Sequence, residues 1–246
     1  MFKKFALALV VTAALPAAAL TTGDIAFTAF NADEDGFAMV ALTNVAANTK
    51  VYFSDNEWSG TAFNTGESFW SWSSGAAVVN AGTVIRFSKT DSATLLAASV
   101  GALARETVAL STNWGLSQTA DTVYAYLGTS AVAATTFLSA ISSGTFGNAA
   151  DGTLANTGLA IGVGAVQLSA SSDYAQYSGA RGDQARFVGY KALVSNVANW
   201  TDSGDGSFAT AVPNTIAFTI TAVPESYALM LAGPGAIGLL VARRRA

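Results

Sequence analysis

Short runs of β-branched and aromatic residues, each bounded by Gly, Asn, Asp or Ser, recur along most of this chain of 246 residues. Apolar and polar positions alternate within several of them, which indicates β-strands because successive side chains of a strand point to opposite faces. About seven to nine strands fit the pattern. The clearest runs occupy residues 23–32, 37–45, 49–56, 83–90, 122–129, 159–170 and 215–223.

Two stretches between these runs have a helical pattern. Asp91 is placed to cap a short helix through residues 92–103, and a second helix is predicted after Asp183. The second helix would carry four apolar residues near one face: Phe187, Tyr190, Val194 and Val197. We therefore expect a mainly β fold, either a β-sandwich or a partly closed barrel, with one or two short helices over an open end.

The first residues have the pattern of a secretory signal peptide over residues 1–19. Lys3 and Lys4 precede an apolar run, and three alanines close it at residues 17–19. The alternative is an N-terminal membrane anchor, but the run is shorter than the ~20 residues that a membrane-spanning helix needs. We expect cleavage near Ala19, which leaves residues 20–222 as an exported β-rich domain.

The last residues form a second hydrophobic segment. Residues 227–242 are apolar apart from one tyrosine hydroxyl, and Arg243, Arg244 and Arg245 follow directly. Positive charge beside a hydrophobic segment is retained on the cytoplasmic side. The segment therefore predicts a helix that anchors the chain in the inner membrane with its body outside. The alternative, a buried C-terminal helix, would place three arginines beside a core at a high cost.

The order of Val223, Pro224 and Glu225, an apolar segment with Leu-Ala-Gly, and a terminal arginine run resembles a PEP-CTERM sorting signal over residues 223–246. Ser226 stands where the second proline of that motif would be. The signal is found on exported proteins of Gram-negative bacteria that make extracellular polysaccharide. The resemblance implies an exosortase-type membrane protease that removes the tail and releases or transfers the body.

The exported body is acidic. Between the terminal segments, seven Lys or Arg face fifteen Asp or Glu, a net charge of about eight negative. Nucleic acid is therefore not expected as a partner. The chain has no Cys and no His, which excludes triads with a histidine base, thiolate nucleophiles and His-ligated zinc.

A second resemblance concerns the fold of the body. The segment at residues 23–58 is similar to the lamin-tail-like sandwich domains of bacterial secreted proteins, in its Gly-Asp-Ile-Ala-Phe opening and its Val-Tyr-Phe-Ser-Asp-Asn strand end. This resemblance covers about the first third of the body and implies a β-sandwich without implying an activity.

Carboxylates are the remaining candidates for catalysis. A glycoside hydrolase needs two of them across a cleft. Residue type alone suggests five: Asp55, Glu57, Glu67, Glu106 and Asp121. No spacing rule selects a pair, and solvated strand ends and turn caps are the favoured explanation, so we expect no catalytic residues and a protein that is not an enzyme.

The stretch NADEDG is a candidate calcium site. Asn31, Asp33 and Asp35 alternate ahead of a glycine, as in the first half of a calcium loop, but position twelve of that loop would be Leu42. Asp55, or Asp202 and Asp205 in the similar DSGDG, are candidates to assist. The favoured alternative is an acidic hairpin turn, so Ca²⁺ is the one cofactor that the sequence suggests.

Two tryptophans are candidates for glycan binding. In ESFWSWSSG, alternation places Trp70 and Trp72 on one face of a strand, with Phe69 on the other. Two neighbouring indoles form either a platform for sugar rings or a core contact. The core is favoured, because large aromatic side chains are usually buried.

Taken together, these features predict a non-enzymatic protein of the cell surface or extracellular matrix, sorted by its C-terminus. Its expected partners are signal peptidase, an exosortase-type protease, the inner membrane during sorting, and extracellular polysaccharide. A carbohydrate-binding module is the alternative hypothesis, and a carboxylate-dependent glycoside hydrolase is the third.

Overall fold

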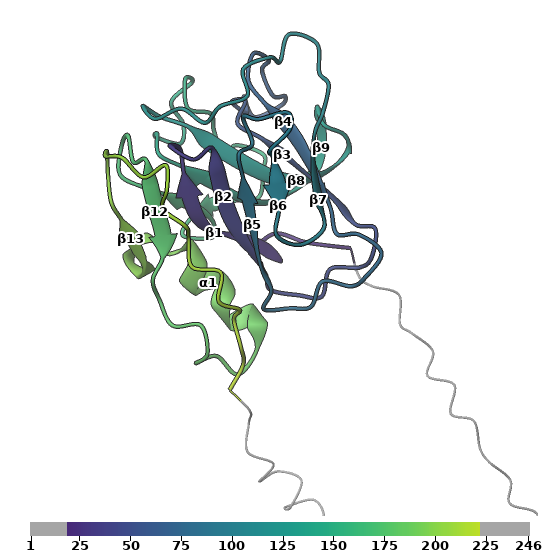
Figure 1. Ribbon diagram of the computed structural model, residues 1–246, viewed down its shortest axis with the longest axis vertical. Helices are drawn as coiled ribbons and strands as arrows, with labels where there is room; N and C mark the ends of the chain where they lie inside the picture. The colour runs from purple at the N-terminus through teal and green to yellow at the C-terminus, as the bar shows by residue number, and fades with distance from the viewer. Residues whose placement is uncertain (1–18, 222–246) are drawn as a thin grey trace, which may run out of the picture.

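The computed structural model describes residues 19–221, which form two β-sheets and one short α-helix (Figure 1). The first sheet has the strand order β13-β12-β1-β2-β5-β6, and the second has the order β10-β11-β9-β8-β3-β4-β7. Both orders run open from edge to edge, so no barrel is closed. The fold is mainly β, and its two sheets are consistent with the expected β-sandwich.

The strands of the first sheet are β1 (Ile25–Asn31), β2 (Gly36–Ala41), β5 (Val84–Ser88), β6 (Ala97–Ala98), β12 (Tyr174–Tyr177) and β13 (Trp200–Asp202). Those of the second are β3 (Lys50–Ser54), β4 (Phe69–Ser73), β7 (Ala102–Arg105), β8 (Thr122–Ser130), β9 (Ala133–Ser142), β10 (Ala160–Ile161) and β11 (Gly164–Gln167). Neighbouring strands are antiparallel except that β11 pairs in parallel with β9 and β10.

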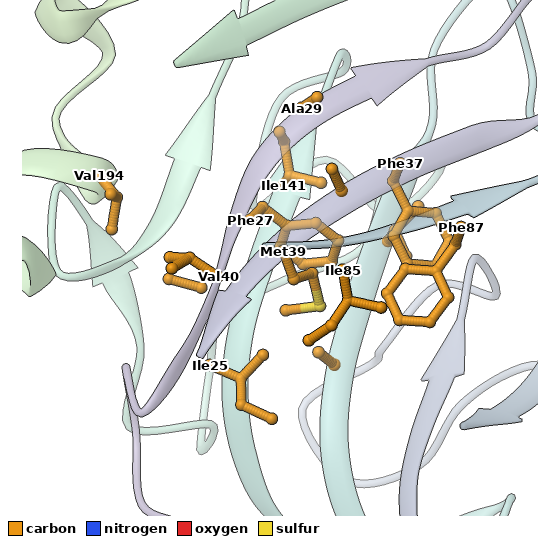
Figure 2. Packing of buried hydrophobic residues seen from close by; sticks show 14 of the residues in the cluster. Ile25, Phe27, Ala29, Phe37, Met39, Val40, Ile85, Phe87, Ile141 and Val194 are labelled. Atoms are coloured by element: carbon orange, nitrogen blue, oxygen red, sulfur yellow. The ribbon is translucent and has the colours of Figure 1, made fainter. Parts of the chain in front are cut away.

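The main hydrophobic core lies between the sheets. Phe53 of β3 contacts Phe37 of β2 and Phe87 of β5, with 5.1 Å between ring centroids in each pair. Figure 2 shows Phe37 and Phe87 side by side within this cluster, next to Met39 and Ile85. Apolar side chains from both sheets are removed from water here, which is the main driving force for folding.

Most of the predicted strands are confirmed, but the run at 215–223 is wrong in its described part. Residues 215–221 form no strand, because their backbone bonds to loops: the Phe218 N–H donates to the Gly82 carbonyl at 2.8 Å and the Thr219 N–H to the Arg181 carbonyl at 2.6 Å. Phe218 is nevertheless buried. The apolar pattern of residues 215–221 therefore predicted the burial of Phe218 correctly but not the pairing of a strand.

The helix predicted at 92–103 is also wrong. Within this segment β6 pairs with β5, and β7 pairs with β4, so the chain passes from the first sheet to the second. A helix this short has little stability of its own, and strand pairing with both sheets outweighs it.

The second predicted helix is confirmed in a shorter form. The helix α1 spans Tyr190–Ser195, between 3-10 turns at Phe187–Gly189 and Val197–Asn199. Tyr190 and Val194 are buried, as their spacing predicted, whereas Val197 is exposed.

Both predicted targeting segments lie outside the described residues. This applies to the signal peptide, to the hydrophobic helix predicted at 227–242, and to the sorting-signal residues Val223, Pro224, Glu225, Arg243, Arg244 and Arg245. Across residues 19–221, none of the helices has the length and apolar character needed to cross a membrane.

Candidate functional site

The outer face of the second sheet, turned away from the first sheet, carries a second hydrophobic cluster. Alternation along β3, β4, β8 and β9 sends one set of side chains into the main core and the other set into this outer cluster. It contains five aromatic residues of the sheet: Tyr52, Phe69, Tyr124, Tyr126 and Phe137. Phe63, from the loop after β3, packs against four of these rings with centroid separations from 5.0 to 6.0 Å.

Hydrogen bonds join the two loops that cover this cluster, residues 55–68 and 144–159. Trp58 Nε1 donates to the Ala155 carbonyl at 2.9 Å, and the Thr153 N–H donates to the Trp58 carbonyl at 2.9 Å. The Tyr124 hydroxyl donates to the Thr153 carbonyl at 3.1 Å, which anchors the second loop to β8.

Gly152 is required at this junction. Its φ is +81°, and a Cβ there would lie 2.4 Å from the Tyr124 hydroxyl oxygen. Any larger residue would push the loop away from the sheet, so only glycine permits this close approach.

The two loops border a cleft of about 400 Å³, within the range of roughly 300 to 1,000 Å³ typical of small-molecule sites. Its lining residues are Glu57, Trp58, Ser59, Asn64, Gly147, Asn148, Ala149, Gly152, Thr153 and Ala155. The cleft thus combines an indole edge with a carboxylate, two amides and hydroxyl groups.

A small acidic cavity lies beside the cleft, at the end of the second sheet where β3 ends and β8 begins. Because β3 and β8 are antiparallel neighbours, Asp55 after β3 and Asp121 before β8 lie at the same end of these strands. The cavity measures about 20 Å³ and is lined by Asp55, Glu57, Glu67, Ala120, Asp121, Thr122, Ala150 and Asp151. Five carboxylates and no Lys or Arg line it.

Backbone N–H groups fix two of these carboxylates. Ser68 donates to Asp55 Oδ1 at 2.6 Å, and Thr122 and Ser117 donate to Asp121 Oδ1 and Oδ2 at 2.7 Å each. Asp55 Oδ2 is buried and has no hydrogen-bond partner among the described residues. A buried acceptor left without a partner carries a substantial desolvation cost.

The crowding of carboxylates alters their protonation. Burial, reinforced by Asp121 and Glu67, raises the pKa of Asp55 well above its ordinary value, and burial likewise raises the pKa of Asp121. Burial and the neighbouring Glu57 raise the pKa of Glu67 to about 7. A carboxyl group of this kind exchanges its proton near neutral pH, as a general acid does.

Four of the five carboxylates suggested by residue type line this cavity: Asp55, Glu57, Glu67 and Asp121. The fifth, Glu106, is part of a separate ion pair with Lys50, at 3.2 Å. Sequence reasoning missed Asp151 and the whole cleft. The adjacency of the β3 end and the β8 start is the signal that joins these residues, and no local spacing contains it.

The predicted calcium motif NADEDG lies elsewhere, in the hairpin between β1 and β2. Its side chains hold loops: Asn31 Nδ2 donates to the Phe208 carbonyl at 3.0 Å, and the Phe208 N–H donates to Asp33 Oδ2 at 2.5 Å. Asp35 Oδ1 accepts from the Leu116 N–H at 2.7 Å. These contacts give the side chains of the hairpin turn a structural role in holding neighbouring loops.

Two of the acids suggested to assist that motif have other contacts. Asp202 Oδ2 accepts from the Ser169 N–H at 2.7 Å, and Asp202 Oδ1 accepts from the Ser172 hydroxyl at 2.6 Å. Asp55 belongs to the acidic cavity. In the part of the chain that the structure describes, no three His, Cys, Asp or Glu side chains already surround one point as metal ligands.

Trp70 and Trp72 form no sugar-binding platform. Their side chains are 0% and 1% exposed and belong to the core between the sheets. Their indole N–H groups donate to the carbonyls of Thr90 at 3.2 Å and Val100 at 2.7 Å. The glycan-binding role suggested for them is therefore wrong, and the favoured alternative, a core contact on one shared face, is confirmed.

Comparison with known proteins identifies no relative: no family model, curated protein or solved structure matches the chain.

Proposed function

We propose that the chain is an exported protein of the cell surface or extracellular matrix, sorted by its C-terminal signal, whose β-domain binds extracellular polysaccharide in the cleft. The observation that carries the binding role is the cleft of about 400 Å³ between two hydrogen-bonded loops on the outer face of the second sheet. The export role rests on the sequence of the two termini.

The lining of the cleft suits a saccharide. Sugars present hydroxyl groups that pair with carboxylates and amides, and Glu57, Asn64 and Asn148 supply both. Trp58 also lines the cleft, but its indole is buried against Phe63 and Phe137, so it shapes the cleft wall and the polar groups carry the recognition. No cation lines the cleft, so a neutral polysaccharide fits better than an acidic one.

A steric test addresses binding directly. Ala149 and Ala155 are exposed and line the cleft, so the double change Ala149→Leu and Ala155→Leu fills it with little effect on stability. Retention of the purified full-length protein on the host's own polysaccharide should fall at least tenfold. The matched control is Ala76→Leu with Ala77→Leu, at exposed positions outside the cleft lining. Equal retention of both double variants would refute binding in the cleft.

The sorting role has a separate test. Intact-mass measurement of protein from the envelope and medium of the native host should show a chain that begins near Leu20 and lacks residues from Tyr227 onward. Replacing Arg243, Arg244 and Arg245 with Ser should weaken membrane retention during sorting. Mature extracellular protein with its arginine tail still attached would contradict sorting without touching the binding proposal.

One observation favours a second candidate function, a glycoside hydrolase: several carboxylates lie at the margin of the cleft, and Glu57 lines both the cleft and the acidic cavity. Release of reducing ends from the host polysaccharide, lost in Glu57→Gln or Glu67→Gln, would replace the binding role with this one. Binding without release supports the first proposal.

A further inference from the structure

The acidic cavity has an excess of negative charge that the described residues do not neutralise. Asp55, Glu57, Glu67, Asp121 and Asp151 line it, whereas Lys and Arg are absent from its lining. Carboxylates gathered in a desolvated space repel one another. Such a cluster is stable only if protons or a cation offset the charge.

Asp55 supplies the cavity with a buried carboxyl group that is only half hydrogen-bonded. The residue is 2% exposed and lines the cavity, its Oδ1 accepts from the Ser68 N–H at 2.6 Å, and its buried Oδ2 has no hydrogen-bond partner among residues 19–221. A carboxyl oxygen that is buried, held in place and not hydrogen-bonded can become a metal ligand when the carboxyl group loses its proton.

Of the other two proposed ligands, Asp121 is held in place and Glu67 has a side chain without hydrogen bonds among residues 19–221. Asp121 is fixed by two backbone N–H groups, from Ser117 and Thr122, each of which uses one lone pair of an oxygen. Glu67 is half-buried, and only its backbone N–H is hydrogen-bonded, to Asn56 Oδ1. Its side chain is therefore free to close over the cavity.

The hairpin acids show that an acidic cluster alone does not make such a site. Asp33 and Asp35 are also close together, but their oxygens accept hydrogen bonds from Gln118, Phe208 and Leu116. The acidic cavity differs because Asp55, which lines it, keeps a buried carboxyl oxygen that accepts no hydrogen bond from residues 19–221.

We propose that the acidic cavity is a binding site for a divalent cation of the calcium class, with Asp55, Glu67 and Asp121 as its protein ligands. All available donors are oxygens, which suits a hard cation. The cavity measures about 20 Å³, room for about one water-sized body, so the ion must lose most of its hydration shell. Calcium does so more readily than magnesium and accepts irregular oxygen geometry.

The site goes beyond the proposed polysaccharide binding and does not depend on it, because the cavity and the cleft share only Glu57 among their lining residues. A cation there would tie Asp55 and Glu67, in the loop after β3, to Asp121 at the start of β8. It would therefore stabilise the first of the two loops that border the cleft.

The test uses full-length protein, stripped of metal with a chelator and titrated with CaCl₂ or MgCl₂ in a calorimeter, with melting followed by circular dichroism. We expect one calcium per chain and a melting temperature raised by roughly 5 to 10 °C at a hundredfold excess over Kd. Magnesium should give a much smaller shift. No calcium binding, or an equal response to magnesium, would overturn the proposal.

Variants locate the ion. Asp55→Asn retains an acceptor for the Ser68 N–H and should weaken calcium binding at least tenfold; Glu67→Gln should do so as well. Asp33→Asn is the matched control in the hairpin and should bind like the parent protein. If Asp55→Asn fails to fold, Glu67→Gln decides, since no described residue donates a hydrogen bond to that side chain. Loss of binding in Asp33→Asn alone would place calcium in the hairpin and refute the cavity site.

Discussion

The two faces of the second sheet are built in different ways. Its inner face packs against another sheet and contains apolar side chains such as Phe53, Trp70 and Trp72. Its outer face carries Tyr124 and Tyr126 among other aromatic residues, and loops cover it. The inner face is therefore stabilised mainly by burial between two sheets, whereas the outer face depends on loops that hydrogen bonds hold in place.

The difference between the two faces suggests that the inner face supplies stability and the outer face supplies the binding sites. A sheet-on-sheet core has no room for a ligand, because protein interiors are close-packed. Loops that run over a sheet leave a cleft where they do not fill the space, and they bring polar side chains to it. The candidate cleft and the acidic cavity both lie on the loop-covered side.

The largest expected effect is on the inner face. Trp70→Ala removes a side chain that is 0% exposed, and such a change costs about 3 to 5 kcal/mol against a typical total of roughly 5 to 15. It also leaves the Thr90 carbonyl without the indole N–H. Denaturant unfolding followed by circular dichroism measures the loss. A loss below about 1 kcal/mol would mean that the inner face relaxes around the change.

A smaller and more local effect is expected on the outer face. Phe63 is the loop residue at the centre of the outer cluster and is partly exposed. Phe63→Ala should cost about 2 kcal/mol, less than a fully buried aromatic residue. Native-state hydrogen exchange should speed up in residues 55–68 and 144–159 while β1, β2 and β5 stay protected. Equal acceleration in both sheets would remove the distinction between the two faces.

A single hydroxyl sharpens the comparison further. Tyr124→Phe removes the hydrogen bond to the Thr153 carbonyl and should cost about 1 kcal/mol. Faster exchange near Gly152 should accompany it, because this bond anchors the second loop to β8. The matched control is Tyr52→Phe on the same face, whose hydroxyl donates to no described residue and whose loss should change stability little. Equal effects of the two changes would show that the Thr153 contact is not an anchor.

The strands were predictable where Val, Ile, Thr and aromatic residues are concentrated between Gly, Asn, Asp or Ser, as in β1, β2, β3, β5 and β8. The strand β9 was missed, because seven of its ten residues are Ala, Ser or Thr and only three are large apolar residues, which gives a weak strand signal. The segment at 215–221 has the composition of a strand, yet no sheet edge accepts it along its length.

The candidate site was predictable by residue type and not by position. Asp55 and Asp121 are far apart in sequence and meet only because β3 and β8 are neighbours in the sheet. The cleft is formed by loops rich in Gly, Asn, Ser and Thr, which carry no periodic signal. The motif that did have calcium-loop spacing, NADEDG, has its side chains occupied by hydrogen bonds instead.

The smallest expected effect concerns the hairpin acid Asp35, whose carboxylate lies against the loop before β8. Burial, with Asp91 and Asp33 adding and with the Leu116 N–H and Lys89 opposing, raises the pKa of Asp35 from 3.8 to about 6. Because the folded-state pKa is the higher one, the stability that Asp35 contributes is present below about pH 4 and is lost as the pH rises through about 6.

Asp35→Asn should therefore match the parent protein near pH 3.5 and become more stable than it above pH 6. Asn retains an acceptor for the Leu116 N–H and tolerates the φ of +54° at this position. The gain should be no more than about 1 kcal/mol, since the side chain is only half-buried and solvent screens its charge.

The control is Asp202→Asn. Burial raises the pKa of Asp202, but hydrogen bonds from Ser172, Ser169 and Gly204 outweigh burial, so the pKa is lowered. That control should lose stability at neutral pH and match the parent protein in acid. Urea unfolding at several pH values measures both variants. A stability difference between Asp35→Asn and the parent protein that does not change with pH would show that burial does not raise the pKa of Asp35.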